Sequence, residues 1–249
     1  MKRVLIVGGS NGIGLSIART LLHKDKIEKI YIVDKEAIAD EYKDDKIKFY
    51  QFDITNSDYS FFNQFNDIDG LVITVGFGKL ALFEDIPEDM ISKYFLVNTI
   101  GVIRIIKHFY KKIISDNHFY SCVMVSIAGF MTSPFFSLYG ATKSALKIFI
   151  ESVNVELMKA GTLNRILNVS PGFIDGTSFY NKKTDIRLTA ELSLSIIDNM
   201  EKKNDLFIPK YDEVYKEVLE RYHKDFRSEG CHSYDYKLSK LSKLDNRHK

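Results

Sequence analysis

A tyrosine and a lysine stand four residues apart in this chain, within the segment Tyr-Gly-Ala-Thr-Lys. At that spacing Tyr139 and Lys143 would share one face of a helix. An ammonium group beside a phenol favours the phenolate, which brings the pKa of the phenol down towards neutrality. Ser126 precedes the pair by thirteen residues and could hydrogen-bond the same substrate oxygen. These side chains predict an acid/base centre that moves a proton at an alcohol or carbonyl oxygen.

The Tyr-x-x-x-Lys pair is weak evidence by itself. An amphipathic helix often carries one lysine whose aliphatic stem covers apolar surface, and a serine at the end of a strand is common. The prediction therefore depends on a second feature, a glycine-rich loop near the N-terminus.

That loop, Val7-Gly8-Gly9-Ser10-Asn11-Gly12-Ile13-Gly14, follows the first apolar run and opens the first helical pattern. Glycine allows a sharp turn and lets a pyrophosphate approach the backbone, and the following helix N-terminus attracts the anion. A glycine cluster can be only a turn, but its place between a strand and a helix favours a dinucleotide site. We expect this site to include Gly8, Ser10, Asn11, Gly12, Ile13 and Gly14.

Asp34 directly follows the second strand candidate, twenty residues after Gly14. A carboxylate at this point can accept hydrogen bonds from both ribose hydroxyls and would repel a 2′-phosphate. NAD(H) is therefore the favoured cofactor. The neighbouring Lys35 could compensate for a phosphate, so NADP(H) remains possible.

Short apolar runs alternate with longer helical patterns along the chain, which is typical of a parallel sheet covered by helices on both faces. The strand candidates are Arg3–Val7, Lys29–Val33, Ile47–Phe52, Leu71–Val75, Tyr120–Ser126, Arg165–Val169 and Leu206–Ile208. The helix candidates are Gly12–His23, Asp58–Gln64, Pro87–Ser115, Ser137–Ala160 and Leu188–Lys202. We predict an α/β fold: a single-domain, Rossmann-like, doubly wound parallel sheet of about seven strands.

The chain of 249 residues suits one such domain, which we place at residues 1–210. Residues 211–249 are rich in Lys, Asp, Glu and Tyr, and we expect one helix followed by a polar tail. We interpret this extension as a solvated terminus, with a role in substrate gating or partner contact as the alternative.

The composition of the chain limits the classes of binding partner that we expect. A formal net charge of +2 gives no reason to expect a nucleic-acid partner, and no apolar stretch approaches the length of a membrane span. The two cysteines, Cys122 and Cys231, suggest neither a disulfide framework nor a zinc site, and we propose no metal. We expect a cytoplasmic protein.

Over residues 1–179 the sequence resembles the short-chain dehydrogenase/reductase family. The glycine loop matches the family's Thr-Gly-x-x-x-Gly-x-Gly, with Val7 at the threonine position, and the Tyr-x-x-x-Lys pair has its usual place. By this resemblance Asn98, Ser126, Tyr139 and Lys143 form the catalytic set. Further cofactor contacts implied by it fall on Asp53, Ile54, Gly76, Tyr139, Lys143, Pro171, Gly172 and Ile174.

The resemblance also implies a function. Members interconvert a secondary alcohol and a ketone with NAD(P)(H), with the tyrosine as acid/base and the lysine on the nicotinamide ribose. Ser126 would hold the substrate oxygen, and Asn98 would anchor a water that links Lys143 to solvent. The long helices Pro87–Ser115 and Ser137–Ala160 resemble the family's pairing surface, which implies a homodimer or homotetramer.

The sequence departs from the family at two places. Ile73-Thr74-Val75-Gly76 stands where Asn-Asn-Ala-Gly is usual, and the threonine expected after the Pro-Gly pair is replaced by Gly176, with Thr177 one place later. Two alternatives stay open: a non-catalytic dinucleotide-binding sensor or scaffold, and a double-bond reductase of the same family. Several apolar side chains flank the catalytic segments, and we interpret most of them as packing groups: Phe130, Met131, Phe135, Phe136, Phe179 and Tyr180.

Overall fold

The computed structural model describes residues 1–177 and 184–245, with side chains described as far as residue 239. Its centre is a seven-stranded sheet in the order β3-β2-β1-β4-β5-β6-β7, and every strand pair is parallel. The strands are β1 Arg3–Val7, β2 Lys29–Asp34, β3 Ile47–Gln51, β4 Gly70–Ile73, β5 Tyr120–Met124, β6 Ile166–Val169 and β7 Leu206–Phe207. The predicted doubly wound parallel sheet is confirmed.

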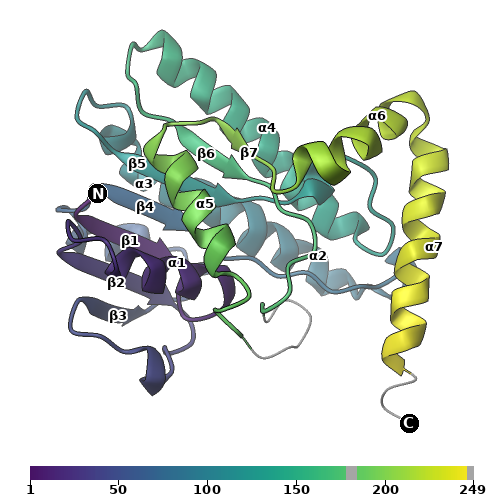
Figure 1. Ribbon diagram of the computed structural model, residues 1–249, viewed down its shortest axis with the longest axis horizontal. Helices are drawn as coiled ribbons and strands as arrows, with labels where there is room; N and C mark the ends of the chain where they lie inside the picture. Colours follow the sequence, from purple (N-terminus) through teal and green to yellow (C-terminus); the bar gives the residue numbers. More distant parts are fainter. Residues whose placement is uncertain (178–183, 246–249) are drawn as a thin grey trace.

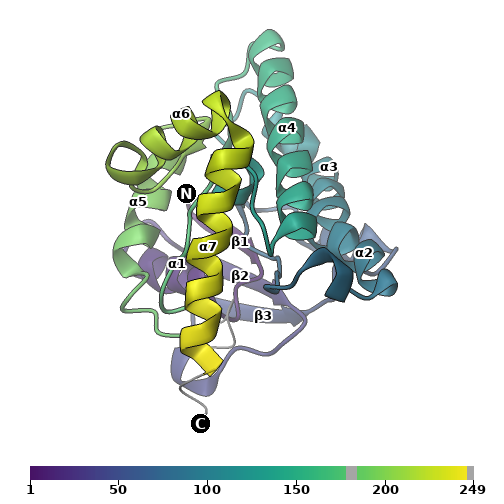
Figure 2. The same cartoon turned by 90° about the vertical axis from the view of Figure 1, so that its right-hand side faces the viewer.

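Helices cover both faces of the sheet, as Figures 1 and 2 show. One face carries α1 Gly12–Leu22 and α5 Ala190–Glu201, and the other carries α2 Glu88–Phe95, α3 Gly101–Ile113 and α4 Ser137–Lys159. The central strands are apolar on both sides because each side packs against helices. Val4 and Ile6 of β1 join the core under α1 and α5, whereas Leu5 and Val7 join the core under α3 and α4.

Two predicted helices differ in kind from the expectation. The helix predicted at Pro87–Ser115 is interrupted by a π-helical turn, Leu96–Ile100, between α2 and α3. The helix predicted at Asp58–Gln64 is a 3-10 helix, Tyr59–Gln64, whose first turn is capped by the Asp58 carboxylate on the Ser60 N–H. Single-turn π segments inside helices are frequent at functional sites, and this one carries Asn98.

The C-terminal extension contains two helices, not the single helix and polar tail that we expected. A π-helical turn, Tyr211–Tyr215, leads into α6 Lys216–Lys224, and α7 Phe226–Asp245 follows. The break between them lies at Asp225, whose backbone is extended. Its Oδ1 accepts from the N–H groups of Arg227 (3.0 Å) and Ser228 (3.1 Å), which starts the second helix.

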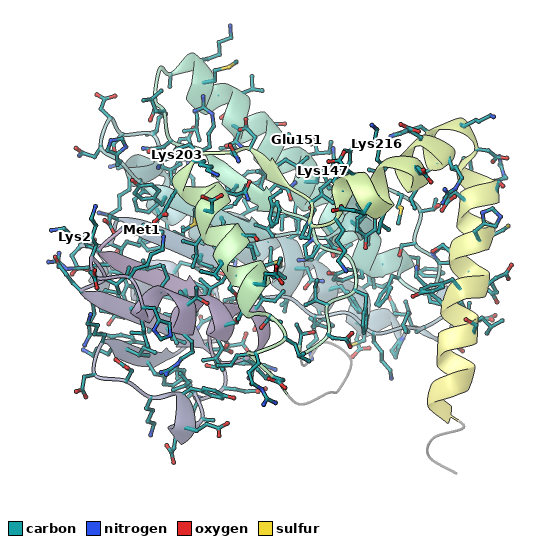
Figure 3. All side chains as sticks on the ribbon, in the orientation of Figure 1. Met1, Lys2, Lys147, Glu151, Lys203 and Lys216 are labelled. Atoms are coloured by element: carbon teal, nitrogen blue, oxygen red, sulfur yellow. The ribbon has the colours of Figure 1, made fainter. Side chains whose placement is uncertain are left out.

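The extension lies at the carboxyl end of the sheet. Figure 3 labels Met1 and Lys2 at the edge where β1 begins, and Lys216, at the start of α6, on the opposite side of the molecule. In the turned view of Figure 2, α7 stands in front of the sheet at the edge where the strands end. None of the described helices is long and apolar enough to cross a membrane.

Candidate active site

The residues that sequence analysis selected follow several different strands at one edge. The glycine loop follows β1, Asp34 closes β2, Gly76 follows β4, Ser126 follows β5 and Pro171 follows β6. Because the carboxyl ends of parallel strands share an edge, these residues all come to the same side of the sheet. Ligands of open α/β sheets bind in the crevice at this edge.

Two positions of the loop require glycine because neighbouring backbone passes too close for a side chain. Gly8 has φ +90°, and a Cβ on it would lie 2.6 Å from the Val75 nitrogen. A Cβ on Gly14 would overlap the carbonyl oxygen of Gly8 and the hydroxyl of Thr74. The loop is therefore packed directly against the segment after β4, and only glycine fits at these positions.

The start of α1 can receive an anion. Asn11 does not cap the helix with its side chain, and no acidic residue occupies the first turn. The Gly12 N–H, at a residue with φ +53°, donates to the Thr184 hydroxyl at 3.1 Å. An acceptor oxygen therefore fits on this N–H group, and the loop residues suit the phosphates of a dinucleotide.

The Asp34 carboxylate is fixed by backbone donors. Its Oδ2 accepts from the Ser10 N–H at 3.0 Å, and its Oδ1 accepts from the Glu36 N–H at 3.4 Å. The Ser10 hydroxyl in turn donates to the Glu36 carbonyl at 2.6 Å. Lys35 extends into solvent and pairs with Glu36 at 3.4 Å. The ribose-binding carboxylate expected here is thus held next to the phosphate loop.

Asp53 and Ile54 face different surroundings. The Thr55 N–H and hydroxyl donate to Asp53 Oδ1 at 2.9 and 2.8 Å, and the backbone bond is the main reason that the pKa of this carboxyl is lowered. Ile54 is buried, and its Cδ1 lies 2.9 Å from the point where a Cβ on Gly101 would stand. The Asp53 side chain and the backbone of this pair could therefore make the adenine contact that we expect. The Ile54 side chain is part of the core.

Lys143 is buried, with 2% of its surface exposed. Its Nζ donates to the Met124 carbonyl at 2.9 Å and lies 5.6 Å from the centre of the Tyr139 ring. Burial lowers the pKa of this lysine to about 7, because an ammonium group is poorly solvated there. Both residues face inward from α4, as their four-residue spacing predicts.

The Ser126 turn packs tightly onto α4. The Ser126 hydroxyl accepts from the Ala128 N–H at 3.1 Å and lies 3.5 Å from the Pro171 carbonyl. A Cβ on Gly129 would stand 2.9 Å from the backbone of Lys143, and one on Gly140 would stand 3.1 Å from the Ala128 oxygen. These two glycines set the distance between the serine turn and the tyrosine helix. Neither glycine was predicted from the sequence, although each lies close in the chain to a catalytic candidate.

Asn98 links three segments of the site. Its amide exchanges two 2.9 Å hydrogen bonds with the backbone of Phe77, and its Nδ2 also donates to the Thr142 hydroxyl at 3.2 Å. Thr142 donates in turn to the Tyr139 carbonyl at 2.7 Å. The asparagine thus fixes the loop after β4 against α4. Thr142, which lies between the tyrosine and the lysine in the Tyr-Gly-Ala-Thr-Lys segment, was not predicted from the sequence as a site residue.

Gly76 and the segment after β6 complete the site. A Cβ on Gly76 would stand 3.3 Å from both Asn98 Oδ1 and Lys143 Nζ, so the loop backbone passes directly over these groups. The Pro171 carbonyl accepts from the Ile127 N–H at 3.0 Å, and the Ile174 carbonyl accepts from the Thr177 hydroxyl at 3.1 Å.

Thr74 joins two neighbouring strand ends. Its hydroxyl donates to the Gly8 carbonyl at 2.8 Å, and its N–H donates to the Val7 carbonyl at 2.8 Å. The end of β4 is thereby joined to the glycine loop after β1. A threonine at the position of the family's usual asparagine holds these two neighbouring strand ends together.

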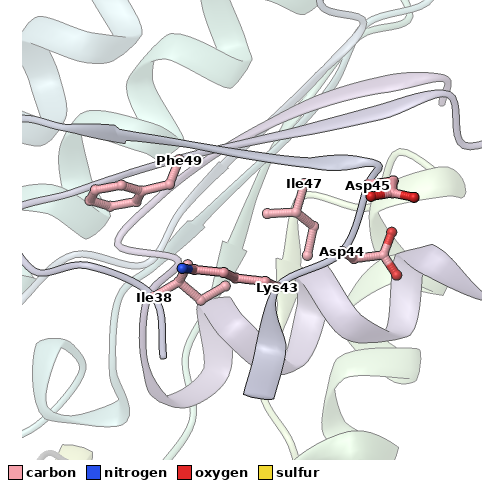
Figure 4. Close-up of a pocket in the computed structure, with 6 residues that line it drawn as sticks. All are labelled: Ile38, Lys43, Asp44, Asp45, Ile47 and Phe49. Carbon is pink, nitrogen blue, oxygen red and sulfur yellow. The ribbon is translucent and has the colours of Figure 1, made fainter. Parts of the chain in front are cut away.

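An apolar cluster surrounds Tyr139. It contains Tyr94, Ala128, Phe136, Leu138 and Tyr139, with Phe77, Leu80, Ile86, Met90 and Phe95 packed against it. Phe179 and Tyr180 lie outside the described residues. A separate hollow, drawn in Figure 4, is lined by Ile38, Lys43, Asp44, Asp45, Ile47 and Phe49. Its wall contains none of the predicted catalytic residues, and we assign it no part in the chemistry.

The sequence model of a family described as short chain dehydrogenase matches residues 2–187. Retinol dehydrogenase 8 of Bos taurus is 27% identical over 232 residues, which cover 87% of this chain and 73% of that protein. A relative in Saccharomyces cerevisiae, named only as an uncharacterized oxidoreductase, is 27% identical over 218 residues, covering 79% of this chain and 70% of its own.

Solved structures resemble the fold over nearly its whole length. A short chain dehydrogenase from Burkholderia cenocepacia in complex with NADP has a TM-score of 0.77 at 19% identity, covering 94% of this chain and 99% of its own. A short chain dehydrogenase/reductase from Burkholderia phymatum in complex with NAD has a TM-score of 0.76 at 15% identity, covering 91% and 94%. At such low identity the likeness establishes the shared fold alone.

Proposed function

This chain belongs to the short-chain dehydrogenase family, and we propose that it interconverts a secondary alcohol and a ketone with a nicotinamide dinucleotide. The observation that carries the proposal is the buried Lys143 ammonium, one helical turn from Tyr139 and 5.6 Å from its ring. A buried lysine without a function would be costly to keep, because burial strongly disfavours its charged form. Perturbed lysines of this kind are concentrated at catalytic sites.

Tyr139 is the proposed general acid and base. When bound, the nicotinamide cofactor supplies or accepts the hydride. In carbonyl reduction Tyr139 donates its phenolic proton to the substrate oxygen, and in alcohol oxidation it takes that proton back. Ser126, at the turn after β5, holds the same oxygen by a hydrogen bond. The positive charge of Lys143 favours the phenolate that remains after reduction.

Burial of Lys143 lowers its pKa, and this matters for the proton transfer. Its pKa of about 7 means that protonated and neutral forms are both accessible near neutral pH. The Met124 carbonyl orients the amine, and from there it can reach a ribose hydroxyl. The water-anchoring role of Asn98 is also proposed, beside its hydrogen bonds to Phe77 and Thr142.

We propose NAD(H) as the preferred cofactor and NADP(H) as the possible substitute. The Asp34 carboxylate, held by the Ser10 N–H at 3.0 Å, suits a ribose with free hydroxyls and repels a 2′-phosphate. Lys35 is the cation nearest in sequence that could offset this repulsion. Several similar structures contain NADP or NADPH and one contains NAD, so the preference rests on Asp34 alone.

The decisive test is Tyr139→Phe, which removes the phenolic oxygen and little else. We expect turnover of alcohols and ketones to fall by about a hundredfold or more, while the dissociation constant for NADH stays near the wild-type value. Nicotinamide fluorescence can follow the binding, since the chain has no tryptophan. Unchanged turnover would remove Tyr139 from the acid/base role. Normal NADH binding without any wild-type turnover would favour a dinucleotide sensor.

Ser126→Ala separates the proposed reaction from double-bond reduction. A substrate oxygen held by Ser126 should make this variant poor at alcohol and ketone conversion. Full activity without the serine hydroxyl would favour reduction of a carbon–carbon double bond. Matched NADH titrations of both proteins keep an effect on cofactor binding apart from an effect on the chemical step.

A further inference from the structure

The C-terminal arm, defined as residues 211–239, is attached to the segment between Ser126 and Tyr139. The Thr132 hydroxyl donates to the Phe226 carbonyl at 3.3 Å. Lys237 Nζ donates to the Ser133 hydroxyl at 2.7 Å and to the Pro134 carbonyl at 2.8 Å. The arm is therefore bound to residues 132–134 by three polar contacts, and not left in solvent as the sequence suggested.

The arm also supports a strained residue in this segment. Phe135 has φ +63°, a left-handed conformation that is unfavourable for a bulky side chain. Its ring lies 4.8 Å from that of Tyr234, on α7, and its carbonyl accepts from the Ala81 N–H at 3.0 Å. Strain of this kind persists only where neighbouring structure imposes it, and it gathers at ligand-binding sites.

A second contact places the arm on the other flank of the site. The Tyr215 hydroxyl fills the space where a Cβ on Gly172 would stand. Burial is the main cause of the raised pKa of the Tyr215 phenol, with Tyr236 of α7 as a further contributor. Gly172 follows Pro171, whose carbonyl is hydrogen-bonded to the turn that carries Ser126. One arm thus touches the segments before Tyr139 and after β6.

We propose that the C-terminal arm forms the outer wall of the substrate site, with Tyr215 and Lys237 as positioning residues, and that this wall selects a carbonyl compound with a bulky apolar body. The inference rests on the proposed function, because it assigns the substrate side of the same site. Tyr215 fixes the wall at Gly172, and Lys237 fixes it at residues 133 and 134.

The apolar preference follows from what surrounds Tyr139. The Phe136 ring lies 5.4 Å from the Tyr139 ring, and Lys237 Nζ lies 5.5 Å from the centre of the Phe136 ring. Phe77 and Tyr94 pack in the same cluster, with ring centres 4.4 Å apart. A substrate oxygen that reaches Tyr139 would be followed by a body in contact with aromatic and aliphatic groups. Small polyols would leave their hydroxyls without partners there.

The test measures ketone binding without turnover. Wild type is saturated with NAD+, and short, medium and long methyl ketones are titrated calorimetrically, since a ketone with oxidised cofactor cannot react. We expect affinity to rise with chain length in wild type. In Tyr215→Ala and Lys237→Met the long ketone should bind about tenfold more weakly, while the short ketone and NAD+ bind as before.

The control is Tyr222→Ala, a tyrosine of α6 whose ring lies 5.3 Å from His223. It should keep the wild-type dependence on chain length. A merely structural role of the arm would lower the melting temperature and weaken short and long ketones alike. The proposal would be overturned if ketone affinity depended on chain length in the same way in wild type and in both variants. It would also be overturned if wild type bound NAD+ but bound long ketones no more tightly than short ones.

Failure of wild type to bind NAD+ would be a different result. It would overturn the proposed oxidoreductase function, and the substrate wall with it. Because NAD+ and ketone are titrated in separate steps, the experiment shows which of the two ideas has failed.

Discussion

At the scale of single residues, the buried Lys143 makes stability depend on pH. Its pKa is about 7 in the fold and 10.5 in the unfolded chain. The unfolded chain therefore binds more protons between these values, so the free energy of unfolding should rise with pH across this window. Each unit of difference corresponds to about 1.4 kcal/mol, which makes the contribution a few kcal/mol in total.

Lys143→Met should remove this dependence. Near pH 6 the variant should be more stable than wild type by a few kcal/mol. Near pH 9 the difference should be smaller, and it should disappear only towards pH 10.5, where the unfolded lysine also loses its proton. Urea unfolding at both pH values measures the difference. A difference that does not change with pH would mean that the lysine keeps its charge at low energetic cost.

Asp34 should control cofactor choice by its charge. Asp34→Asn keeps an oxygen that can accept from the Ser10 N–H but no longer repels a 2′-phosphate. We expect NADH to bind about tenfold more weakly, because a hydrogen bond to a charged acceptor is lost, and NADPH to bind more tightly than to wild type. Parallel titrations measure both constants. Equal affinity of wild type for the two cofactors would already remove the basis for this prediction.

The candidate catalytic residues could be predicted from the sequence because the reaction requires particular side chains at a particular spacing. Ser126, Tyr139 and Lys143 carry reactive groups at a recognisable spacing, so a pattern could select them. Thr142 and Thr74 act through hydrogen bonds to residues far away in the chain. Such roles depend on which segments meet in space, and one sequence contains little information on that.

At the scale of elements, the glycine contact between the serine turn and α4 can be tested directly. Gly129→Ala places a methyl group 2.9 Å from the Lys143 backbone, which must push the turn away from the helix. We expect a loss of about 1–3 kcal/mol in stability and a larger loss of turnover than of NADH binding. Steady-state kinetics and thermal unfolding measure these effects.

Gly161→Ala is the matched control. Gly161 has φ +85°, but a Cβ on it meets no atom within 4 Å. The substitution should cost about 1 kcal/mol from backbone strain alone and leave turnover unchanged. If both variants lose activity in proportion to stability, the turn at Ile127–Gly129 does not position the catalytic groups.

Strands could be predicted from the sequence where both of their faces are buried. Strand β4 is buried throughout and β1 is buried from Val4 onward, so their apolar runs stand out and their bounds differ by at most two residues from the prediction. The C-terminal arm gave no such signal. Its helices are held by single polar contacts, such as those of Lys237, and by an ion pair from Arg221 to the buried Glu229 at 2.7 Å. In a segment with many charges, the sequence does not show which charged residues make such contacts.

At the scale of the whole molecule, layering explains why the site is built from distant segments. The parallel sheet brings the ends of β1, β2, β4, β5 and β6 to one edge, and α7 stands at that edge in Figure 2. Sequence order alone predicts the edge, because every strand in such a sheet points the same way. It does not predict what covers the edge, since the arm follows the sheet and could have packed elsewhere.

The outer face of α4 is the surface where we propose that two copies pair. Ile148, Val155 and Met158 are each more than half exposed on this one helix, and exposed apolar groups gathered in this way often mark an interface. Introducing charges with Ile148→Glu and Val155→Glu should convert a homodimer or homotetramer to smaller species in sedimentation velocity. Leu194→Glu, at an equally exposed leucine of α5, should leave the assembly intact. A wild type that sediments as a monomer would refute pairing through α4, and an equal effect of Leu194→Glu would show that the charge, and not the surface, disrupts the assembly.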